Sequence, residues 1–296
     1  MSKSHPHFLS ASVIVGGLLC GTAAHALWSF DQAGVTGLVA KDSIGTIIAG
    51  DPTLSLTGVY AANGASDVGF ATNATWQAGA LSYFVGAGQG MYSGGETTSP
   101  FHALDNNGNT EAVILQFGSS VVLSSIGIGY TSDNNGLTSP DTVDVSVFRW
   151  MGSGTPTGSP SPLVGQGAAA MTGWQLVGNY GDMGVDTSNP YNAVNTGQPL
   201  GTGTGGAGGR GSSWWMISAY NSGYSGAQET RGTLDVGNDF FKLYAVAGTK
   251  CTSQVAGVCG PGGQAPEPTS LALLGLGILG IVGSRRRQAK SELVAG

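Results

Sequence analysis

Short segments in which apolar and polar residues alternate recur along the central part of the chain. Alternation with a period of two is typical of a β-strand whose two faces meet different surroundings. In the clearest example, Val143, Val145 and Val147 share one face, while Asp144 and Ser146 share the other. Eight such segments are expected to form strands: 54–60, 80–86, 112–117, 121–130, 142–150, 173–180, 213–220 and 239–248.

Clusters of Gly, Asn, Ser and Pro separate these segments, and the body of the chain shows no convincing amphipathic helix. Many short strands with polar turns predict an all-β domain over residues 27–250, namely a β-sandwich or a jelly roll. Residues 152–170 and 197–211 are rich in glycine and other small residues, so we expect them to form mobile loops.

An apolar stretch also lies near each end of the chain. Residues 8–24 follow a weakly basic start, and a small-x-small triplet ends at Ala26. This order is typical of a secretory signal peptide, so residues 1–26 are predicted to form a signal helix that is removed before Leu27. The protein is therefore expected to leave the cytoplasm.

The second apolar stretch, Thr269–Ser284, holds 16 residues, and as a helix it would cover about 24 Å. The hydrocarbon core of a bilayer is about 30 Å thick and is usually spanned by about 20 apolar residues. The stretch is therefore short for a permanent membrane anchor.

Charged residues are sparse, at 9% of the chain, compared with about 25% in an average soluble protein. Residues 27–266 contain 15 acidic and six basic side chains, a net charge of −9. Proteins bind the phosphates of nucleic acids through clusters of Lys and Arg, so this acidic region is not expected to bind nucleic acid.

Two cysteines, Cys251 and Cys259, remain after the signal peptide is removed. In an oxidising compartment, two cysteines this close together are expected to form a local disulfide. A zinc site would need further Cys or His residues nearby, and the neighbouring sequence has none. Residues 251–265 are predicted to form a linker rich in Gly and Pro.

Oxygen-bearing side chains alternate in the segment that begins at Asp105. Asp105, Asn107, Asn109 and Glu111 offer the hard oxygen ligands that calcium prefers, so a calcium site is one prediction. A tight turn is the other, because Asn107 and Gly108 both accept the positive φ angles that such turns need. The sequence leaves both open, and calcium is the one possible cofactor.

Few residues offer catalytic chemistry. The exported part contains a single histidine, His102, and no G-x-S-x-G motif occurs. A secreted hydrolase with paired carboxylates stays open, because the sequence does not give the separation of the acids. We predict that the chain is not an enzyme. Trp150, Trp174, Trp214 and Trp215 are expected to fill the core or to line a platform for sugar rings.

The C-terminal segment combines three features in a fixed order. Pro266-Glu267-Pro268 is followed by an apolar run over 271–282 and then by Arg285-Arg286-Arg287. This order resembles the PEP-CTERM sorting signal of Gram-negative bacteria. The resemblance implies that a membrane-embedded exosortase recognises the Pro-Glu-Pro region, and that residues 266–288 form a sorting segment with a transmembrane helix. The arginines and residues 289–296 would then stay in the cytoplasm.

The body of the chain resembles, more loosely, a family of exosortase-dependent surface proteins. This resemblance rests on the segment SPFHALDN, Ser99–Asn106, and on the later segments IGIGY and DVSVFRWMG. It implies a location at the surface and no particular activity.

These observations predict an exported surface or extracellular-matrix protein that is held briefly in the inner membrane and then sorted by an exosortase. A structural or adhesive role linked to exopolysaccharide or biofilm is expected. The alternatives are a calcium-dependent carbohydrate-binding module and a secreted carboxylate-based hydrolase. The expected partners are the exosortase, the inner membrane and an extracellular polysaccharide.

Overall fold

The computed structural model shows an all-β protein. It describes residues 26–65, 68–93, 102–133, 142–152, 154–158, 161–185, 191–195, 210–235, 237–251 and 259. The chain forms strands and loops within these ranges, and none of the described helical turns is long and apolar enough to span a membrane. The predicted transmembrane helix lies outside the described residues, and so does the predicted signal helix except for its last residue, Ala26, which lies in a strand.

Each of the eight segments expected to be strands overlaps an observed strand. Two of them, 112–117 and 121–130, are joined into one strand of 25 residues. The strands of the described part are β1 Ala26–Ser29, β2 Leu54–Ala62, β3 Gln77–Phe84, β4 Gly88–Tyr92, β5 Leu104–Asp105, β6 Asn109–Asp133, β7 Thr142–Trp150, β8 Trp174–Gly184, β9 Tyr191–Ala193, β10 Ser212–Ala219, β11 Glu229–Arg231 and β12 Asp239–Lys250.

These strands are hydrogen-bonded into one sheet, in the order β1-β12-β4-β3-β2-β6-β10-β7-β8-β11, while β5 pairs with β12 and β9 with β6. The sheet closes on itself because β12 pairs with β6 as well as with β4. Strands β12, β4, β3, β2 and β6 thus form a small closed barrel, and β10, β7, β8 and β11 continue the sheet beyond β6. We call these four strands the wing. The all-β class is confirmed, whereas the two facing sheets of a sandwich or jelly roll are not.

The long strand β6 belongs to both the barrel and the wing. Its first half pairs with β2, where Leu54 lies opposite Phe117, and with β10. Its second half pairs with β12, where Val121 lies opposite Lys250. The strand changes partners around 118–120, where glycine and serine leave room for a bend without interrupting the strand.

The main hydrophobic cluster fills the inner face of the sheet. Val143, Val145 and Val147 lie in it, as their alternation predicts, together with the fully buried Trp215 and Phe241. Side chains of this size each contribute roughly 1.5–3 kcal/mol when they are removed from water. The cluster therefore supplies much of the stability of the barrel and holds the wing against it.

The outer face of the wing is also covered, because the loop that follows β7 folds back over it. Leu163 and Ala168 of this loop are buried in a second hydrophobic cluster with Phe148. The amide of Ala168 donates to the carbonyl of Ala74 at 2.9 Å, which fastens the loop to a neighbouring one. The described part of 152–170 is thus a packed layer, in contrast to the mobile loop that its small residues predict; residues 197–209 lie outside the described part.

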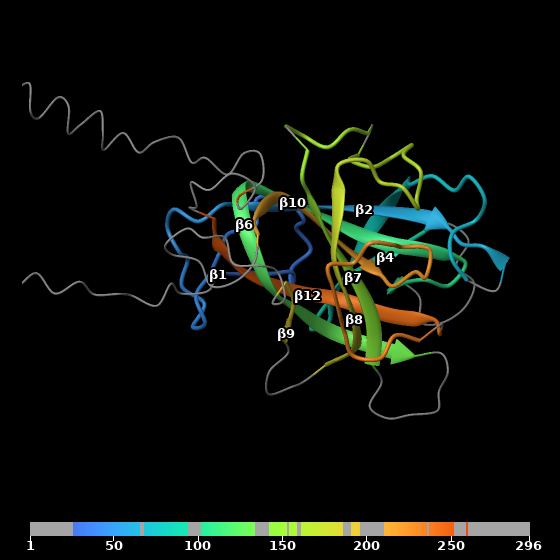
Figure 1. Ribbon diagram of the computed structural model, residues 1–296. Coiled ribbons are helices and arrows are strands. Elements are labelled where there is room, and N and C mark those ends of the chain that lie inside the picture. The colour runs from blue at the N-terminus through green and yellow to red at the C-terminus, as the bar shows by residue number, and fades with distance from the viewer. Residues whose placement is uncertain are drawn as a thin grey trace, which may run out of the picture.

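The first and last strands bring the two ends of the described body to one end of the barrel (Figure 1). β1 begins at Ala26, which lies opposite Gly248 near the end of β12. Directly after β12, Cys251 forms a disulfide with Cys259, the pair that their spacing predicts. We call this the tail end, and we call the opposite end, where β12 begins at Asp239, the far end.

Candidate functional site: an aromatic hollow and a buried polar network

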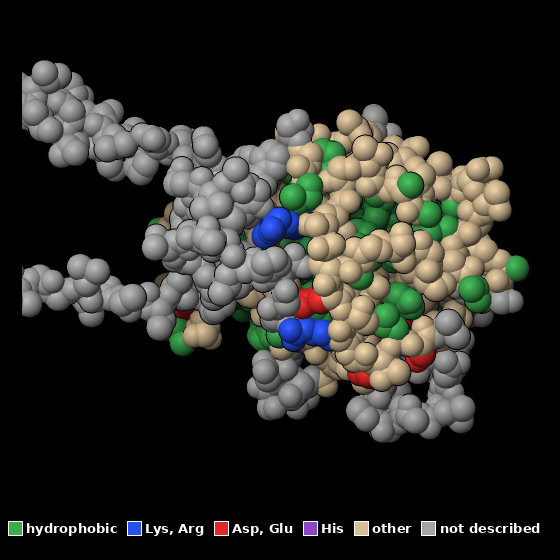
Figure 2. Space-filling view, in the orientation of Figure 1, with side chains coloured by type: hydrophobic (Ala, Val, Ile, Leu, Met, Phe, Trp, Pro, Cys, Tyr) green, Lys and Arg blue, Asp and Glu red, His purple; other side chains and the backbone are tan. Residues whose placement is uncertain are grey.

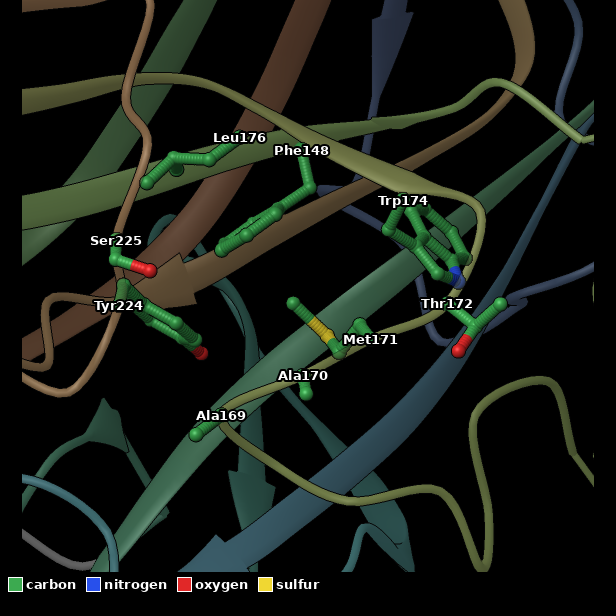
Figure 3. A pocket seen from close by; sticks show the side chains of 9 residues that line it. All are labelled: Phe148, Ala169, Ala170, Met171, Thr172, Trp174, Leu176, Tyr224 and Ser225. Carbon is green, nitrogen blue, oxygen red and sulfur yellow. The ribbon is translucent and has the colours of Figure 1, made fainter.

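A hollow of about 350 Å³ opens on the outer face of the wing. Phe148 and Leu176, from β7 and β8, and Tyr224, from the loop after β10, are buried at its base. Met171 and Trp174 are half-buried and line it nearer the solvent. Figure 3 shows the ring of Trp174 at one end of the hollow and the rings of Phe148 and Tyr224 at the other, with Met171 between them.

Contacts between aromatic rings hold these walls in place. The centroids of the Phe148 and Tyr224 rings lie 4.7 Å apart at an interplanar angle of 67°, and those of Trp150 and Trp174 lie 5.7 Å apart at 60°. The hydroxyl of Tyr224 also lies 2.8 Å from Oγ of Ser218. Burial raises the pKa of Tyr224, so the phenol stays neutral and available only as a hydrogen-bonding group.

None of the side chains that line the hollow is charged, and Thr172 and Ser225 add one hydroxyl each. Flat apolar faces with a few hydroxyl groups suit a neutral ligand that has both apolar and polar faces, such as a sugar ring. The volume lies at the small end of the range of about 300–1,000 Å³ that is usual for ligand sites. The lining is compatible in chemistry with such a ligand, and it contains no Asp, Glu, His, Lys or Cys side chain.

Three of the four tryptophans considered for a sugar platform belong to the core. Trp150, Trp214 and Trp215 are 6%, 7% and 0% exposed. Trp174 alone of the four lines the hollow. The expected core role is therefore confirmed for three of the tryptophans, whereas a platform for sugar rings at Trp174 stays a prediction.

The four residues of the predicted calcium site lie around the turn between β5 and β6. Asp105 and Glu111 are buried, and the amide of Asp105 donates to Oε2 of Glu111 at 3.3 Å. The amide of Asn107 donates to Oδ1 of Asp105 at 3.0 Å, while Asn109 is half-buried. Gly108 has a φ of 73°, so the predicted tight turn is confirmed.

No group of three or more Asp, Glu, His or Cys side chains is arranged to hold a metal ion within the described residues. The predicted calcium set contains two such residues, Asp105 and Glu111, and two asparagines. The structure brings the two acidic residues together and places Asn107 against one of them. Calcium binding at this turn stays a prediction.

Asn106 of this turn, which the sequence pattern did not single out, forms hydrogen bonds with distant parts of the chain. Its Nδ2 donates to the carbonyls of Tyr220 and Gly237, at 3.0 and 3.1 Å, and to Oδ2 of Asp239 at 3.3 Å. Its Oδ1 accepts from the amide of Asp239 at 2.8 Å. The sole signal in the sequence is the DNNG segment, which turn chemistry already explains, whereas the partners lie more than 100 residues away.

Asp144 of β7 continues this network and is 3% exposed. Its amide donates to Oδ1 of Asp239 at 2.7 Å, while its own carboxylate accepts from the amides of Asp182 at 3.2 Å and Asp235 at 2.7 Å. Burial raises the pKa of Asp144 to about 6; the two amide donors act against this increase, and the neighbouring carboxylates add to it.

We refer to Asn106, Asp144, Asp182, Asp235 and Asp239 as the far-end network. Each carboxylate oxygen of Asp144 already accepts a backbone hydrogen bond. The network therefore joins β7, β8 and β12 and the loop before β12, which is a structural role. A carboxylate offers about four acceptor sites, and backbone amides occupy two of those of Asp144.

Comparison with known proteins adds evidence about the C-terminal segment. Residues 264–287 match the PEP-CTERM protein-sorting motif, which includes the predicted sorting residues and lies outside the described part of the structure. No curated protein and no solved structure matches the chain, so the resemblance of the body to exosortase-dependent surface proteins stays a prediction. The chain therefore carries a PEP-CTERM sorting motif, which implies export, transit in a membrane-anchored state and recognition by an exosortase.

Proposed function

We propose that this protein is a structural or adhesive component of the cell surface or the extracellular matrix, associated with exopolysaccharide or biofilm and delivered there by an exosortase. The observation that carries the proposal is the PEP-CTERM motif at residues 264–287 behind an all-β body. The low proportion of charged residues supports it, and Figure 2 shows few charged side chains on the visible face of the body. A surface of hydroxyl, amide and backbone groups is compatible with a hydrated polysaccharide.

The sorting step is tested by replacement of Pro266, Glu267 and Pro268 with alanine in the native host. We expect the variant to keep its C-terminal segment, as measured by mass, and to accumulate in the inner-membrane fraction. A matched variant with Arg285, Arg286 and Arg287 changed to lysine keeps the positive charges and separates charge from side-chain identity. Normal maturation and normal localisation of the alanine variant would contradict the sorting step.

The matrix role needs a separate test. In a strain that lacks the gene, we expect reduced retention of exopolysaccharide on the cells, with recovery when the gene is supplied in trans. The alanine variant of the Pro-Glu-Pro region should fail to restore retention, because it does not reach its destination. Unchanged retention in the deletion strain would rule out the structural or adhesive role, while the sorting step would be unaffected.

The second candidate function is the binding of a neutral carbohydrate, and the aromatic hollow is the observation that favours it. Trp174 presents a half-buried ring, and hydroxyl groups lie beside it. Removal of apolar surface from water contributes roughly 25 cal/mol per Å², so contact between one ring and one sugar unit contributes a modest free energy. A single hollow of this kind would thus give weak binding, which repeated copies on a surface would strengthen.

A polysaccharide pull-down and a glycan array test this second candidate. Trp174→Ala should lower retention at least about threefold, whereas Tyr92→Ala, which removes a 42% exposed ring outside the hollow, should leave it unchanged. The same measurement with and without EDTA tests calcium, which the residues around Asp105 and Glu111 would have to bind. Absence of retention on every glycan would exclude the carbohydrate-binding role.

The proposal includes the absence of enzymatic activity. The alternative of a carboxylate-based hydrolase is tested by incubation of the protein with the exopolysaccharide of its host and measurement of new reducing ends. Hydrolysis that is lost in Asp144→Asn but kept in Asp31→Asn, at an exposed position, would overturn the proposal in favour of an enzyme.

A further inference from the structure

Three apolar side chains are exposed on the loop between β1 and β2. Ile44, Ile47 and Val39 are 85%, 62% and 40% exposed. A turn presents Ile44 at its tip: the carboxylate of Asp42 accepts from the amides of Ile44 at 3.0 Å and Thr46 at 2.8 Å. We call Val39, Ile44 and Ile47 the apolar tip. Burial of Leu38 and Ala40 on either side of Val39 anchors its base, so the exposed residues are the ones that point outward.

The apolar tip is fastened to the tail end of the body. Leu27 of β1 forms a bridge with Lys41, whose partner on the other side is Ile47. Nζ of Lys250, the last residue of β12, donates to the carbonyl of Gly50 at 3.1 Å. In Figure 1 this loop lies beside β1, at the end of the barrel where β12 finishes. The tip and the start of the C-terminal segment therefore lie on the same side of the body.

The chain between this end and the sorting motif is short. The disulfide from Cys251 to Cys259 closes a small loop, so the connection to the motif effectively begins at Cys259, which bridges to Gly211 beside β10. Pro266 lies seven positions after Cys259, and Leu271 lies twelve positions after it. Even fully extended, these spans are at most about 25 and 43 Å. While the C-terminal segment is in the membrane, the tail end must stay near the lipid surface.

We propose that the apolar tip inserts into the outer surface of the inner membrane while the chain is held there by its sorting segment. A protein partner is a poorer match, because three side chains on one turn offer far less than the about 800 Å² per partner of a stable interface. Binding to a lipid surface needs no minimum buried area of this kind, because each apolar side chain that enters the lipid contributes separately. Lys41 lies at the base of the tip and is complementary to lipid phosphates.

Charge does not distinguish the two ends of the body, because Asp42 and Asp51 lie beside Lys41 and Lys250 at the tail end. The proposal is therefore carried by the exposed apolar side chains and by the short connection to the sorting motif. The inference rests on the membrane-anchored transit that the sorting motif implies and is independent of the proposed adhesive or carbohydrate-binding role.

Photo-crosslinking to lipids tests the inference in the full chain. The chain is reconstituted by its C-terminal segment into vesicles of phosphatidylethanolamine and phosphatidylglycerol that contain an alkyne-tagged phospholipid, and only floated vesicles are analysed. p-Benzoylphenylalanine replaces Ile44 or Ile47, and, as controls of matched exposure, Val85 or Val68.

The controls lie well away from the tip. Val85 lies in the turn between β3 and β4, and this turn contacts Leu243 of β12 through Gly88. Leu243 lies seven residues, or about 23 Å along the strand, before Lys250 at the end of β12. Val68 lies beyond the end of β2, whose nine residues cover about 30 Å from Leu54. Collision with lipid would label all four positions to a similar degree, because their exposures are similar in pairs, at 85% and 87% and at 62% and 58%.

We expect lipid labelling at positions 44 and 47 to exceed that at positions 85 and 68 at least fivefold, as an order-of-magnitude expectation for inserted against colliding side chains. Ile47→Asp should reduce labelling at position 44 at least about threefold, whereas Val68→Asp should not, because a charge at the tip opposes insertion. Equal labelling at the four positions, or labelling at position 44 that resists Ile47→Asp, would overturn the inference even with the tail correctly in the membrane.

Discussion

Replacement of Asp144 by asparagine should change how the stability of the protein depends on pH. Burial raises the pKa of Asp144 from 3.8 to about 6 in the folded chain. The folded state therefore holds this proton more tightly than the unfolded state does. It follows that Asp144 contributes stability that is fully present below about pH 4 and is lost as the pH rises through about 6. Asparagine does not titrate, so the variant lacks this component.

The expected magnitude follows from the pKa values. A difference of about 2 pKa units corresponds to about 3 kcal/mol, at 1.36 kcal/mol per unit, and about 2 kcal/mol of it falls between about pH 4.5 and about pH 7.5. The Asp144 side chain is only 3% exposed, so screening by solvent reduces this free-energy difference little. In the wild-type chain the carboxylate accepts hydrogen bonds from two backbone amides. In the variant the Nδ2 group cannot accept from the amide that it faces, and this unmade hydrogen bond costs about 1–3 kcal/mol at every pH.

Urea unfolding followed by tryptophan fluorescence measures this effect, with the full chain in a mild non-ionic detergent. We expect Asp144→Asn to lower the free energy of unfolding more at about pH 4.5 than at about pH 7.5, by about 2 kcal/mol. Asp31→Asn, at an exposed position, serves as the control for a general charge effect. If the loss is equal at the two pH values, or larger at neutral pH, the amide donors outweigh burial and the reasoning is wrong.

Three further changes test the packing. Gly90→Ala should destabilise the fold by about 1–3 kcal/mol in urea unfolding, because a Cβ there would lie 1.7 Å from a backbone oxygen, whereas Gly118→Ala, with no atom nearer than 3.6 Å, should have little effect. Leu163→Ala should cost about 2–5 kcal/mol by the same assay if the loop is a packed layer, and near zero if it is not. Paired replacement of Cys251 and Cys259 by alanine should lower stability by about 2 kcal/mol, as expected for a closed loop of eight residues.

The strands were accessible to sequence reasoning because their signals are local. The pattern over 142–150 coincides with β7, since the valines, a turn on each side and the alternation all lie within one short window. Strand β4, Gly88–Tyr92, was not predicted, because its two glycines and one glutamine give no alternation of apolar and polar residues. The break at 118–120 predicted two strands, but hydrogen bonds to different partners on either side keep β6 continuous.

The sequence only partly predicted which faces of the strands are buried. Val143, Val145 and Val147 share one face and lie in the inner cluster, but Asp144 and Ser146, on the opposite face, are buried as well. They are buried because other parts of the chain cover that face, and alternation along one strand carries no information about what lies above it. The raised pKa of Asp144 has the same origin.

The sequence by itself determined the features that are written in neighbouring residues: most of the strands, the cysteine pair, the turn at Gly108 and the PEP-CTERM motif at residues 264–287. Tertiary structure alone decided the closure of the barrel, the aromatic hollow, the far-end network and the position of the apolar tip. Each of these depends on contacts between segments far apart in the chain, such as Asn106 with Asp239 and Lys250 with Gly50. Such contacts follow from how the whole sheet closes, and no single window of the sequence records that.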